Sequence, residues 1–383
     1  MRILLLSAYD ADSHVYWRKG LVEHLNEHEW TVLSLPGRYF SWRMRGNSLS
    51  WAFNERETLS QPYDLVIATS MTDLSALRGF VPSLAQIPTL VYFHENQFAY
   101  PESGKAFKTV EPCILNLYTA LAADYCLFNS EYNRQTLLDG AKALLKKMPD
   151  QVPANLIERI RDNSAVLSVP IKSDSYQIHS SESDEFHIVW NHRWESVLHG
   201  QPINITWAAR WEYDKGPDRL LAILEVLEER AIDYRLCILG QSFKNSPKQF
   251  ETIRKDFAHR IDQMGFAESR AEYIAWLNAS DIFLSTSIHE FQGLSVLEAV
   301  AQGALPILPN RMSYTEMFEG EFLYDDCGSD VEKEAVKAVD LIEYQIGQIR
   351  QGRANTPSVE GYSWSTLKPE YERIINSLTA RKQ

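Results

Sequence analysis

The sequence predicts an α/β protein made of two domains, each with an open parallel sheet covered by helices. Its 383 residues exceed one typical domain and are enough for two. Short apolar runs alternate with longer amphipathic stretches along almost the whole chain, which is typical of βαβ units. The apolar runs lack polar alternation, as expected of strands that are covered on both faces.

The first half of the chain contains five apolar runs that we interpret as buried strands, each followed by a loop and a helical pattern. They are Ile3–Ser7, Thr31–Leu35, Leu65–Thr69, Thr89–Phe93 and Tyr125–Asn129. Residues 1–171 are therefore expected to form an N-terminal domain. The alternation stops at residues 172–185, a polar and serine-rich segment with little to bury, which is interpreted as a linker.

The alternation resumes beyond this segment, and residues 186–362 are assigned to a C-terminal domain. The expected strands are 186–191, 203–209, 234–239, 281–286 and 304–308, and the expected helices are 217–230, 268–279 and 294–302. Residues 363–383 contain the amphipathic segment Ser365–Leu378, expected to form a terminal helix that packs back toward the N-terminal domain. Ligands of open parallel sheets lie at the carboxyl ends of strands, so we expect the site in a cleft where the two sheets face each other.

Composition points to a globular protein of a reducing compartment. The hydrophobic fraction of 45% and the charged fraction of 23% are those of a soluble domain, and no apolar run approaches the length of about 20 residues that a membrane span needs. The start, MRILLLSAYD, turns polar too soon for a signal peptide and is interpreted as a strand. The four cysteines are far apart without C-x-x-C spacing, which suits the cytoplasm.

The charge is acidic and unevenly distributed. A net charge of −13 argues against a protein that coats nucleic acid nonspecifically. Residues 1–170 carry 16 Lys and Arg against 18 Asp and Glu, whereas the remaining residues carry 22 against 33. A polyanionic partner would therefore prefer the N-terminal half.

The strongest functional signal is the segment Leu284–Leu308, in which a strand is followed by a loop and then by a helix. Gly293 opens the helix, and Leu294 and Ser295 form its first turn. The unpaired N–H groups and the positive dipole end of a helix N-terminus suit a diphosphate, and the glycine allows close approach of the backbone.

Two acidic residues accompany this helix start. Glu298 lies about one turn into the helix, where a carboxylate can accept hydrogen bonds from both hydroxyls of a ribose. Glu290, in the loop, can reach a sugar beyond the phosphates. The alternative is an ordinary amphipathic helix with two solvated glutamates, but the strand, the glycine and both acids occur in the order that a site requires.

A second signal is the segment 209–216, ARWEYDKG, in which Arg210 and Lys215 are five residues apart. A guanidinium can bind two phosphate oxygens, while a lysine acts as a point charge. The alternative is a solvated basic loop. Arg193 is a rival for the role of Arg210, because WNHRWE at 190–195 resembles WAARWE at 207–212, but Leu198 then stands where the lysine is needed.

The third signal is His94 with the polar residues that follow it, at the end of a predicted strand. A lone histidine is usually a packed or capping residue. The position at the carboxyl end of a strand favours contact with a ligand hydroxyl.

The spacing of Glu290 and Glu298, with LEAVAQGALPI at 297–307, resembles the E-x7-E signature of retaining glycosyltransferases of the GT-B fold in family 4. The resemblance implies two Rossmann-like domains that face each other across a cleft, with a nucleotide sugar held mainly by the C-terminal domain. It further implies that Arg210 and Lys215 clamp the phosphates and stabilise the leaving group, so that no metal is required. Glu290 and His94 would hold the hexose, and Gly240 and Phe266 are further expected donor contacts.

A narrower resemblance covers nearly the whole chain. FHENQF (93–98), FNSEYN (128–133), RWEYDKGP, STSIHEFQGLSVLEA and YSWSTL (362–367) are similar to the tRNA-queuosine α-mannosyltransferase family. This resemblance implies transfer of mannose from GDP-mannose to the cyclopentenediol of queuosine in a tRNA anticodon. The sequence departs from the family's pattern at Asp10-Ala11-Asp12, where a glycine-rich turn is typical, and at the duplicated HRWE segment.

Contact with a tRNA acceptor would need cations interleaved with aromatic side chains. Trp42, Arg43 and Arg45 supply this combination beside Tyr39 and Phe40, and the family has a similar segment. His14 and Asn96 are also expected on the acceptor side. Lys142, Lys146 and Lys147 either extend this surface or form a solvated helix face.

Two other functions remain open at this point, and the sequence does not indicate the oligomeric state. The protein could be a family 4 enzyme that acts on a small molecule, lipid or glycan, or a non-catalytic nucleotide-sugar or RNA-binding protein on the same scaffold. Asp10 and Asp12 form a D-x-D pattern, but its place directly after the first strand favours a solvated loop over a metal site.

Overall fold

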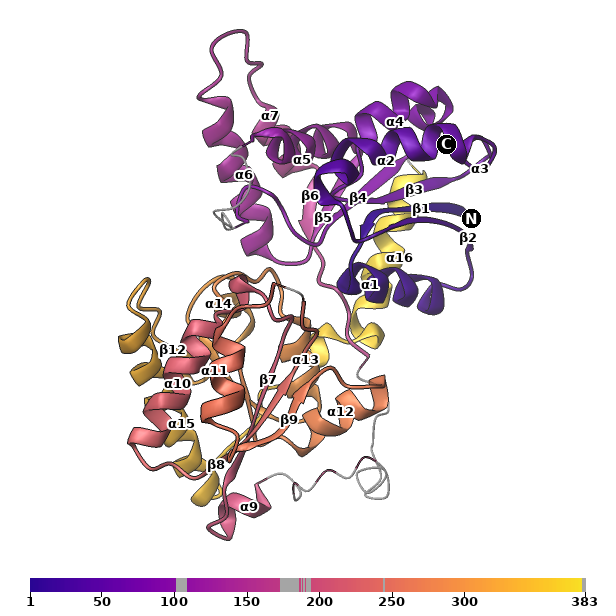
Figure 1. The fold of residues 1–383 in the computed structure, drawn as a ribbon. Helices are drawn as coiled ribbons and strands as arrows, with labels where there is room; N and C mark the ends of the chain where they lie inside the picture. Colours follow the sequence, from indigo (N-terminus) through magenta and orange to yellow (C-terminus); the bar gives the residue numbers. More distant parts are fainter. Residues whose placement is uncertain are drawn as a thin grey trace. The chain divides into compact units, whose positions relative to one another are not determined.

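The computed structural model describes residues 1–100, 109–172, 186, 188, 190, 194–243 and 245–380. The chain forms two compact units, shown in Figure 1. Unit 1 comprises Met1–Pro170 and Trp364–Gln383, and unit 2 comprises Ile171–Ser363. The predicted linker, residues 172–185, lies outside the described residues from position 173 onward.

Unit 1 contains a six-stranded parallel sheet with the strand order β2-β1-β3-β4-β5-β6. The strands are β1 (Arg2–Asp10), β2 (Glu29–Pro36), β3 (Leu65–Thr69), β4 (Thr89–Phe93), β5 (Tyr125–Phe128) and β6 (Ser164–Val166). Both β3 and β4 have the bounds expected from the sequence, because their fully buried apolar residues leave no ambiguity. The short edge strand β6 was not predicted, since Ser164–Val166 carries no apolar run.

The helices of unit 1 cover both faces of this sheet. They are α1 (Asp12–His24), α2 (Phe40–Asn54), α3 (Arg56–Leu59), α4 (Leu74–Phe80), the 3₁₀ turn η1 (Pro82–Gln86), α5 (Glu111–Ala122), α6 (Glu131–Leu145), α7 (Leu156–Asp162) and α16 (Trp364–Ala380). Side-chain caps fix two helix starts: Asp73 accepts a hydrogen bond from the amide of Ala76, and Ser130 accepts one from the amide of Asn133.

The last helix, α16, packs within unit 1 (yellow in Figure 1), as the sequence predicts. It buries Tyr371, Ile374, Ile375 and Leu378, which recur at the spacing of one helix face. The Tyr371 hydroxyl accepts a hydrogen bond from the indole N–H of Trp17 and donates one to the carbonyl of Ser168, at 3.1 and 3.0 Å.

Unit 2 contains a second six-stranded parallel sheet, in the order β12-β11-β10-β7-β8-β9. Its strands are β7 (Ile203–Ala208), β8 (Tyr234–Leu239), β9 (Ile261–Gly265), β10 (Ile282–Leu284), β11 (Leu305–Pro309) and β12 (Leu323–Tyr324). The strand expected at 186–191 is wrong at its described residues, since Phe186, Ile188 and Trp190 lie outside strands. Strands β9 and β12 were not predicted from the sequence, because β9 is mostly polar and β12 has only two residues.

The principal helices of unit 2 lie on opposite faces of the sheet (Figure 1): α10, α11 and α15 on one face, and α12 and α13 on the other. Their bounds are α10 (Pro217–Glu229), α11 (Gln249–Asp256), α12 (Arg270–Ala279), α13 (Leu294–Ala301) and α15 (Val331–Arg350). The shorter elements are α9 (Glu195–Leu198), η2 (Tyr213–Lys215), α14 (Tyr314–Met317), η3 (Gly320–Phe322) and η4 (Glu360–Tyr362). The sequence missed α11 and α15.

Among the described residues, no helix is both long enough and apolar enough to cross a membrane.

Candidate active site

Two loops lie together at the carboxyl end of the sheet in unit 2. One follows β7 and contains residues 209–216, and the other follows the neighbouring strand β10 and contains residues 285–293. The amides of Ile288 and His289 donate to the Asp214 carbonyl at 3.0 and 3.1 Å. The Thr286 hydroxyl donates to the Lys215 carbonyl at 2.8 Å. The two loops are therefore joined by hydrogen bonds to backbone carbonyls, none of which involves a charged side chain.

Gly216 makes this close contact possible. Its φ of +63° lies in the left-handed region, and a Cβ at this position would overlap with the carbonyl oxygen of Thr286. The glycine that follows Lys215 is therefore required by the packing of the two loops.

Lys215 is at the centre of the joined loops, and only 9% of it is exposed. Its Nζ lies 3.1 Å from Glu290 Oε2 and 3.3 Å from Asp214 Oδ2, and donates to the His289 carbonyl at 3.0 Å. Burial acts to lower the pKa of Lys215, but the carboxylates of Glu290 and Asp214 outweigh it, so the net shift raises this pKa. Burial likewise acts to raise the pKa of Glu290, and Lys215 reverses the effect, so that this pKa is lowered. Both side chains are therefore charged at neutral pH.

The N-terminus of α13 begins beside this ion pair. Gly293 has a φ of +81°, and a Cβ there would lie 2.9 Å from Cε1 of Tyr314 and 3.6 Å from Cγ of Glu290. Leu294 and Ser295 form the first turn of α13, where backbone N–H groups have no partner within the helix. Lys215, Glu290 and Gly293, which the sequence predicts to act together, thus lie within one small region.

Arg210 lies on the loop after β7 and forms an ion pair with Glu212, with 2.9 Å between Nη1 and Oε2. The positive charge of Arg210 acts to lower the pKa of Lys215, opposing the effect of the carboxylates of Glu290 and Asp214. The rival residue, Arg193, lies outside the described residues. Arg210 therefore contributes positive charge to the same loop as Lys215.

Glu298 has a partner that the sequence did not indicate. Its carboxylate, on α13, is buried and forms a bidentate ion pair with Arg270 of α12. In this pair, Arg270 Nη1 donates to Glu298 Oε2 at 3.1 Å. The alternative of two solvated glutamates is wrong, because Glu298 and Glu290 are each bound to a cation.

The two other predicted donor contacts lie at the same edge of the sheet. Gly240 follows β8 with a φ of +151°, and a Cβ there would overlap with the Ala209 carbonyl. Phe266 follows β9 and is 69% exposed. Because β7, β8 and β9 are neighbours, both residues lie on the side of the Lys215 loop away from α13.

In unit 1, His94 follows β4 and is 5% exposed. Its ring stacks on His14 with centroids 4.2 Å apart and meets the edge of Trp17 at 4.9 Å. Burial, helped by the neighbouring His14, lowers the pKa of His94 well below its ordinary value. Within the described residues, His94 Nε2 has no hydrogen-bond partner. His94 is therefore a neutral imidazole with an unused nitrogen at the carboxyl end of the sheet.

Asn96 is fully buried, and its side chain is occupied by the protein itself. Its amide donates to Asn133 and to Thr136, while its carbonyl oxygen accepts from the amides of Phe98 and Ala99. The expectation that Asn96 contacts the acceptor is therefore wrong. Its side chain instead holds the loop after β4 against α6.

The aromatic and basic side chains around α2 differ in their exposure to solvent. Trp42 is 54% exposed, whereas Arg43 is half-buried. Arg45 is bound by Asp73 at 3.1 Å and by Glu111 at 3.0 Å, and these two hydrogen bonds raise its pKa. Part of the charge of Arg45 is thus neutralised within the unit.

The expectation of a solvated loop at the D-x-D pattern is wrong for its first residue. Asp10 is largely buried and binds Arg18 through both carboxylate oxygens, at 2.6 to 3.0 Å. The Ser7 hydroxyl donates to the same carboxylate at 2.8 Å. Within the described ranges, no group of three or more His, Cys, Asp or Glu side chains is arranged to hold a metal ion.

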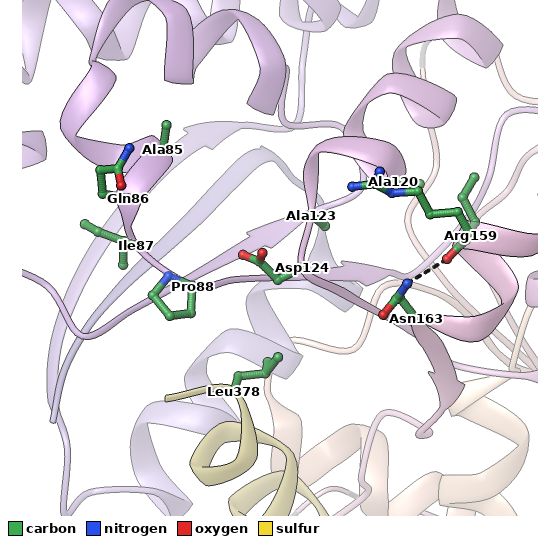
Figure 2. A pocket seen from close by; sticks show the side chains of 11 residues that line it. Ala85, Gln86, Ile87, Pro88, Ala120, Ala123, Asp124, Arg159, Asn163 and Leu378 are labelled. Carbon is green, nitrogen blue, oxygen red and sulfur yellow. Dashed lines mark hydrogen bonds between the residues drawn. The ribbon is translucent and has the colours of Figure 1, made fainter. Parts of the chain in front are cut away.

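A cavity of about 400 Å³ lies elsewhere in unit 1 (Figure 2). It is lined by Pro88, Asp124 and Asn163, which immediately precede β4, β5 and β6. The cavity is therefore at the amino ends of the strands, whereas His94 is at the carboxyl end. It does not coincide with the predicted site.

Comparison with known proteins places the chain in a family. The family described as "tRNA-queuosine alpha-mannosyltransferase N-terminal" matches residues 2–171, and "Glycosyl transferases group 1" matches residues 189–341. A tRNA-queuosine alpha-mannosyltransferase of Drosophila melanogaster is 32% identical over 323 residues, which are 84% of this chain and 83% of the relative. A GDP-mannose:cellobiosyl-diphosphopolyprenol alpha-mannosyltransferase of Xanthomonas oryzae is 29% identical, over 26% of each chain.

Solved structures support the fold over the full length. HepE of Anabaena, solved with UDP, has a TM-score of 0.64 at 12% identity, covering 98% of this chain and 99% of that chain. Sucrose-phosphate synthase of Thermosynechococcus elongatus has a TM-score of 0.67 at 12% identity, covering 99% of both chains. These likenesses confirm the predicted GT-B fold. Together with the Drosophila relative, they establish that this chain is a GT-B glycosyltransferase and belongs to the tRNA-queuosine alpha-mannosyltransferase family.

Proposed function

We propose that this protein transfers mannose from GDP-mannose to the queuosine of a tRNA, with retention of the anomeric configuration. The name of the Drosophila relative supports the mannose and the tRNA acceptor, and the name of the Xanthomonas relative supports the GDP-linked donor. The single observation that carries the chemistry is the buried Lys215–Glu290 ion pair beside the N-terminus of α13.

The donor diphosphate binds to Lys215, Arg210 and the amides of Leu294 and Ser295. These groups combine two cations with a helix N-terminus, an arrangement that binds phosphates. During transfer the bond from the anomeric carbon to the phosphate oxygen breaks, and negative charge develops on the departing diphosphate. Lys215 stabilises this charge, since its raised pKa keeps it protonated throughout the physiological range.

The carboxylates hold the hydroxyl groups of the donor. Glu290 accepts from the hexose, and Glu298 accepts from the ribose while it remains bound to Arg270. Gly240 and Phe266 lie on the side where the base binds. His94 contributes the remaining hexose contact, because a neutral imidazole can accept or donate a hydrogen bond to a hydroxyl.

The acceptor tRNA binds to the surface that contains Trp42, Arg43 and Arg45. Exposed aromatic side chains stack on unpaired bases, such as those of an anticodon loop. Because Asp73 and Glu111 already bind Arg45, the exposed indole of Trp42 is the larger contributor. His14 acts on this side through its stacking contact with His94.

The decisive experiment incubates the purified protein with GDP-mannose and with tRNA that contains or lacks queuosine. Mannosylated queuosine, detected by mass spectrometry of the digested nucleosides, is the expected product and appears only with the first tRNA. Transfer to a lipid or small glycan, with no reaction on either tRNA, would establish the alternative family 4 activity. Tight binding of GDP-mannose without any transfer would establish a non-catalytic role.

A further inference from the structure

We infer that three buried charged residues, Arg219, Glu334 and Arg311, set the geometry of the Lys215–Glu290 pair and are positioning residues for the reaction. We call them the RER triad. The inference rests on the proposed function, because it assigns the triad to the donor site described above. None of the three was selected from the sequence.

Glu334 of α15 is the centre of the RER triad and is completely buried. Its Oε1 accepts from Nε of Arg219 at 2.9 Å and from Nη2 of Arg311 at 2.8 Å, and its Oε2 accepts from Nη1 of Arg311 at 2.9 Å. The backbone amide of Cys327 lies 3.3 Å from the same Oε2. A buried carboxylate is tolerated only when it is paired in this way.

Arg311 connects the RER triad to the loop that bears Glu290. Its Nε donates to the Ser287 carbonyl at 2.9 Å. The next two residues contact Glu290 directly: the Glu290 amide donates to Met312 Sδ at 3.1 Å, and the Ser313 hydroxyl donates to the Glu290 carbonyl at 3.4 Å. Residues 311–313 thus hold the loop at both ends of the segment 287–290.

The backbone of Met312 shows that this contact is enforced. Met312 has a φ of +56°, a left-handed conformation that is unfavourable for a residue with a side chain. Such a conformation persists only where the surroundings determine it, and strained residues gather at functional sites. Arg311, which immediately precedes Met312, is anchored by Glu334, so the RER triad fixes the chain next to this residue.

Arg219 connects the RER triad to the other loop. It lies in the first turn of α10, four residues after Lys215, and its Cδ would be 3.4 Å from a Cβ on Gly216. Its Nη2 also donates to the Gly328 carbonyl at 2.6 Å. One carboxylate therefore anchors both the turn that bears Lys215 and the loop that bears Glu290.

The RER triad acts through these loops and does not bind the donor itself. The guanidinium groups of Arg219 and Arg311 are largely buried, and each is bound to Glu334 and to a backbone carbonyl. Each also binds a second carboxylate, that of Asp218 or Asp326. A buried ion pair is a poor source of stability compared with apolar packing, so stability alone does not account for the RER triad. Displacement of a positioned catalytic group by about 1 Å can cost a hundredfold in rate.

The test compares Glu334→Gln and Arg311→Lys with Arg230→Gln as a matched control. Arg230 pairs with Asp340 and Glu343 on the same helix α15, but at the exposed surface. We expect kcat to fall by roughly 10- to 100-fold in the two triad variants, with a smaller change in KM for GDP-mannose, and to stay near the wild-type value in the control. Arg311→Lys keeps the charge and loses the fork of hydrogen bonds to Glu334 and Ser287.

A second measurement keeps the result interpretable if Glu334→Gln folds poorly or the wild type transfers no mannose. We expect GDP, titrated by calorimetry, to bind Arg311→Lys about tenfold more weakly than Arg230→Gln. Variants with a lowered melting temperature but with wild-type kcat, KM and GDP affinity would overturn the inference. A wild-type protein that binds GDP without transferring mannose would contradict the proposed function, and the GDP affinities alone would then decide the role of the RER triad.

Discussion

The two units of this protein prepare their functional groups in opposite ways. In unit 2, the cations and carboxylates around Lys215 are ionised and bound to one another, within loops that backbone contacts lock together. In unit 1, His94 is held neutral among aromatic rings, and Asn96 is used entirely by its neighbours. The difference teaches that the candidate residues of unit 2 are fixed by charge, whereas those of unit 1 are fixed by aromatic packing and neutral hydrogen bonds.

The largest expected effect comes from removing the central charge of unit 2. Lys215→Ala should lower kcat by about 10²- to 10³-fold, because one preorganised charge at the leaving group contributes that much to a rate. Steady-state transfer from GDP-mannose measures the effect, and circular dichroism verifies the fold. Lys337→Ala, which removes a surface lysine of the same unit, is the control. Near-normal turnover in the Lys215 variant would contradict the proposal that unit 2 acts through the fixed charge of this lysine.

A smaller effect is expected from the neutral histidine of unit 1. His94→Gln should reduce kcat by about tenfold to a hundredfold, since it replaces one hydrogen-bonding group at the hexose. GDP affinity should remain unchanged, because His94 belongs to the other unit. Weaker GDP binding in this variant would contradict the proposal that His94 contacts only the hexose of the donor.

His94 also predicts a dependence of stability on pH. Its folded-state pKa is depressed below the ordinary value of 6.5, so its stabilising contribution is fully present above pH 6.5 and is lost as the pH falls toward the folded-state pKa. Melting temperatures measured from pH 7.5 downward should therefore fall more steeply for the wild type than for His94→Gln. Parallel curves for the two proteins would contradict the assignment of a neutral buried imidazole.

The acceptor surface should respond to Trp42 more than to Arg45. Trp42→Ala is expected to weaken tRNA binding by about tenfold, the effect of losing one stacked base, while Arg45→Ala changes it by less. Gel-shift titrations with queuosine-containing tRNA measure both affinities, and KM for GDP-mannose serves as the control. A larger loss for Arg45 would mean that Asp73 and Glu111 release it when tRNA binds.

The smallest effect is expected from removing divalent metal ions. Incubation with EDTA should leave the rate of transfer unchanged, because in the proposed mechanism Lys215 and Arg210 supply the positive charge at the diphosphate. Loss of activity that Mg²⁺ or Mn²⁺ restores would show that these two cations are insufficient.

The sequence predicted much of the fold and several residues that the structure places close together in unit 2. Strands such as β3, β4 and β8 were found because buried parallel strands are continuous apolar runs. The resemblance to family 4 glycosyltransferases is what linked Lys215 to Glu290 and Gly293, and the structure shows that these residues lie close together. In α15, the buried residues Ala335, Ala338, Val339 and Ile342 recur at helical spacing, so this helix was present in the sequence and was overlooked.

Other parts of the site could not be read from local sequence. Arg270 binds Glu298, and Arg311 binds Glu334, across separations of 28 and 23 residues. Such pairs form only when distant elements meet, and an arginine carries no local mark of its partner. The prediction for Asn96 was wrong for the same reason, because its partner Asn133 lies 37 residues away. Residue type predicted the possible chemistry at these positions, and tertiary contacts decided how it is used.

The return of α16 to unit 1 has a consequence for how the chain matures on the ribosome. Trp364 stacks on His24 with centroids 4.4 Å apart, and Tyr371 meets the indole of Trp17, so the first domain is discontinuous in sequence. Its final layer emerges only after residues 171–363 have been synthesised. A nascent chain therefore holds an incomplete first domain, with the aromatic groups beneath α16 uncovered, during the translation of nearly 200 further residues.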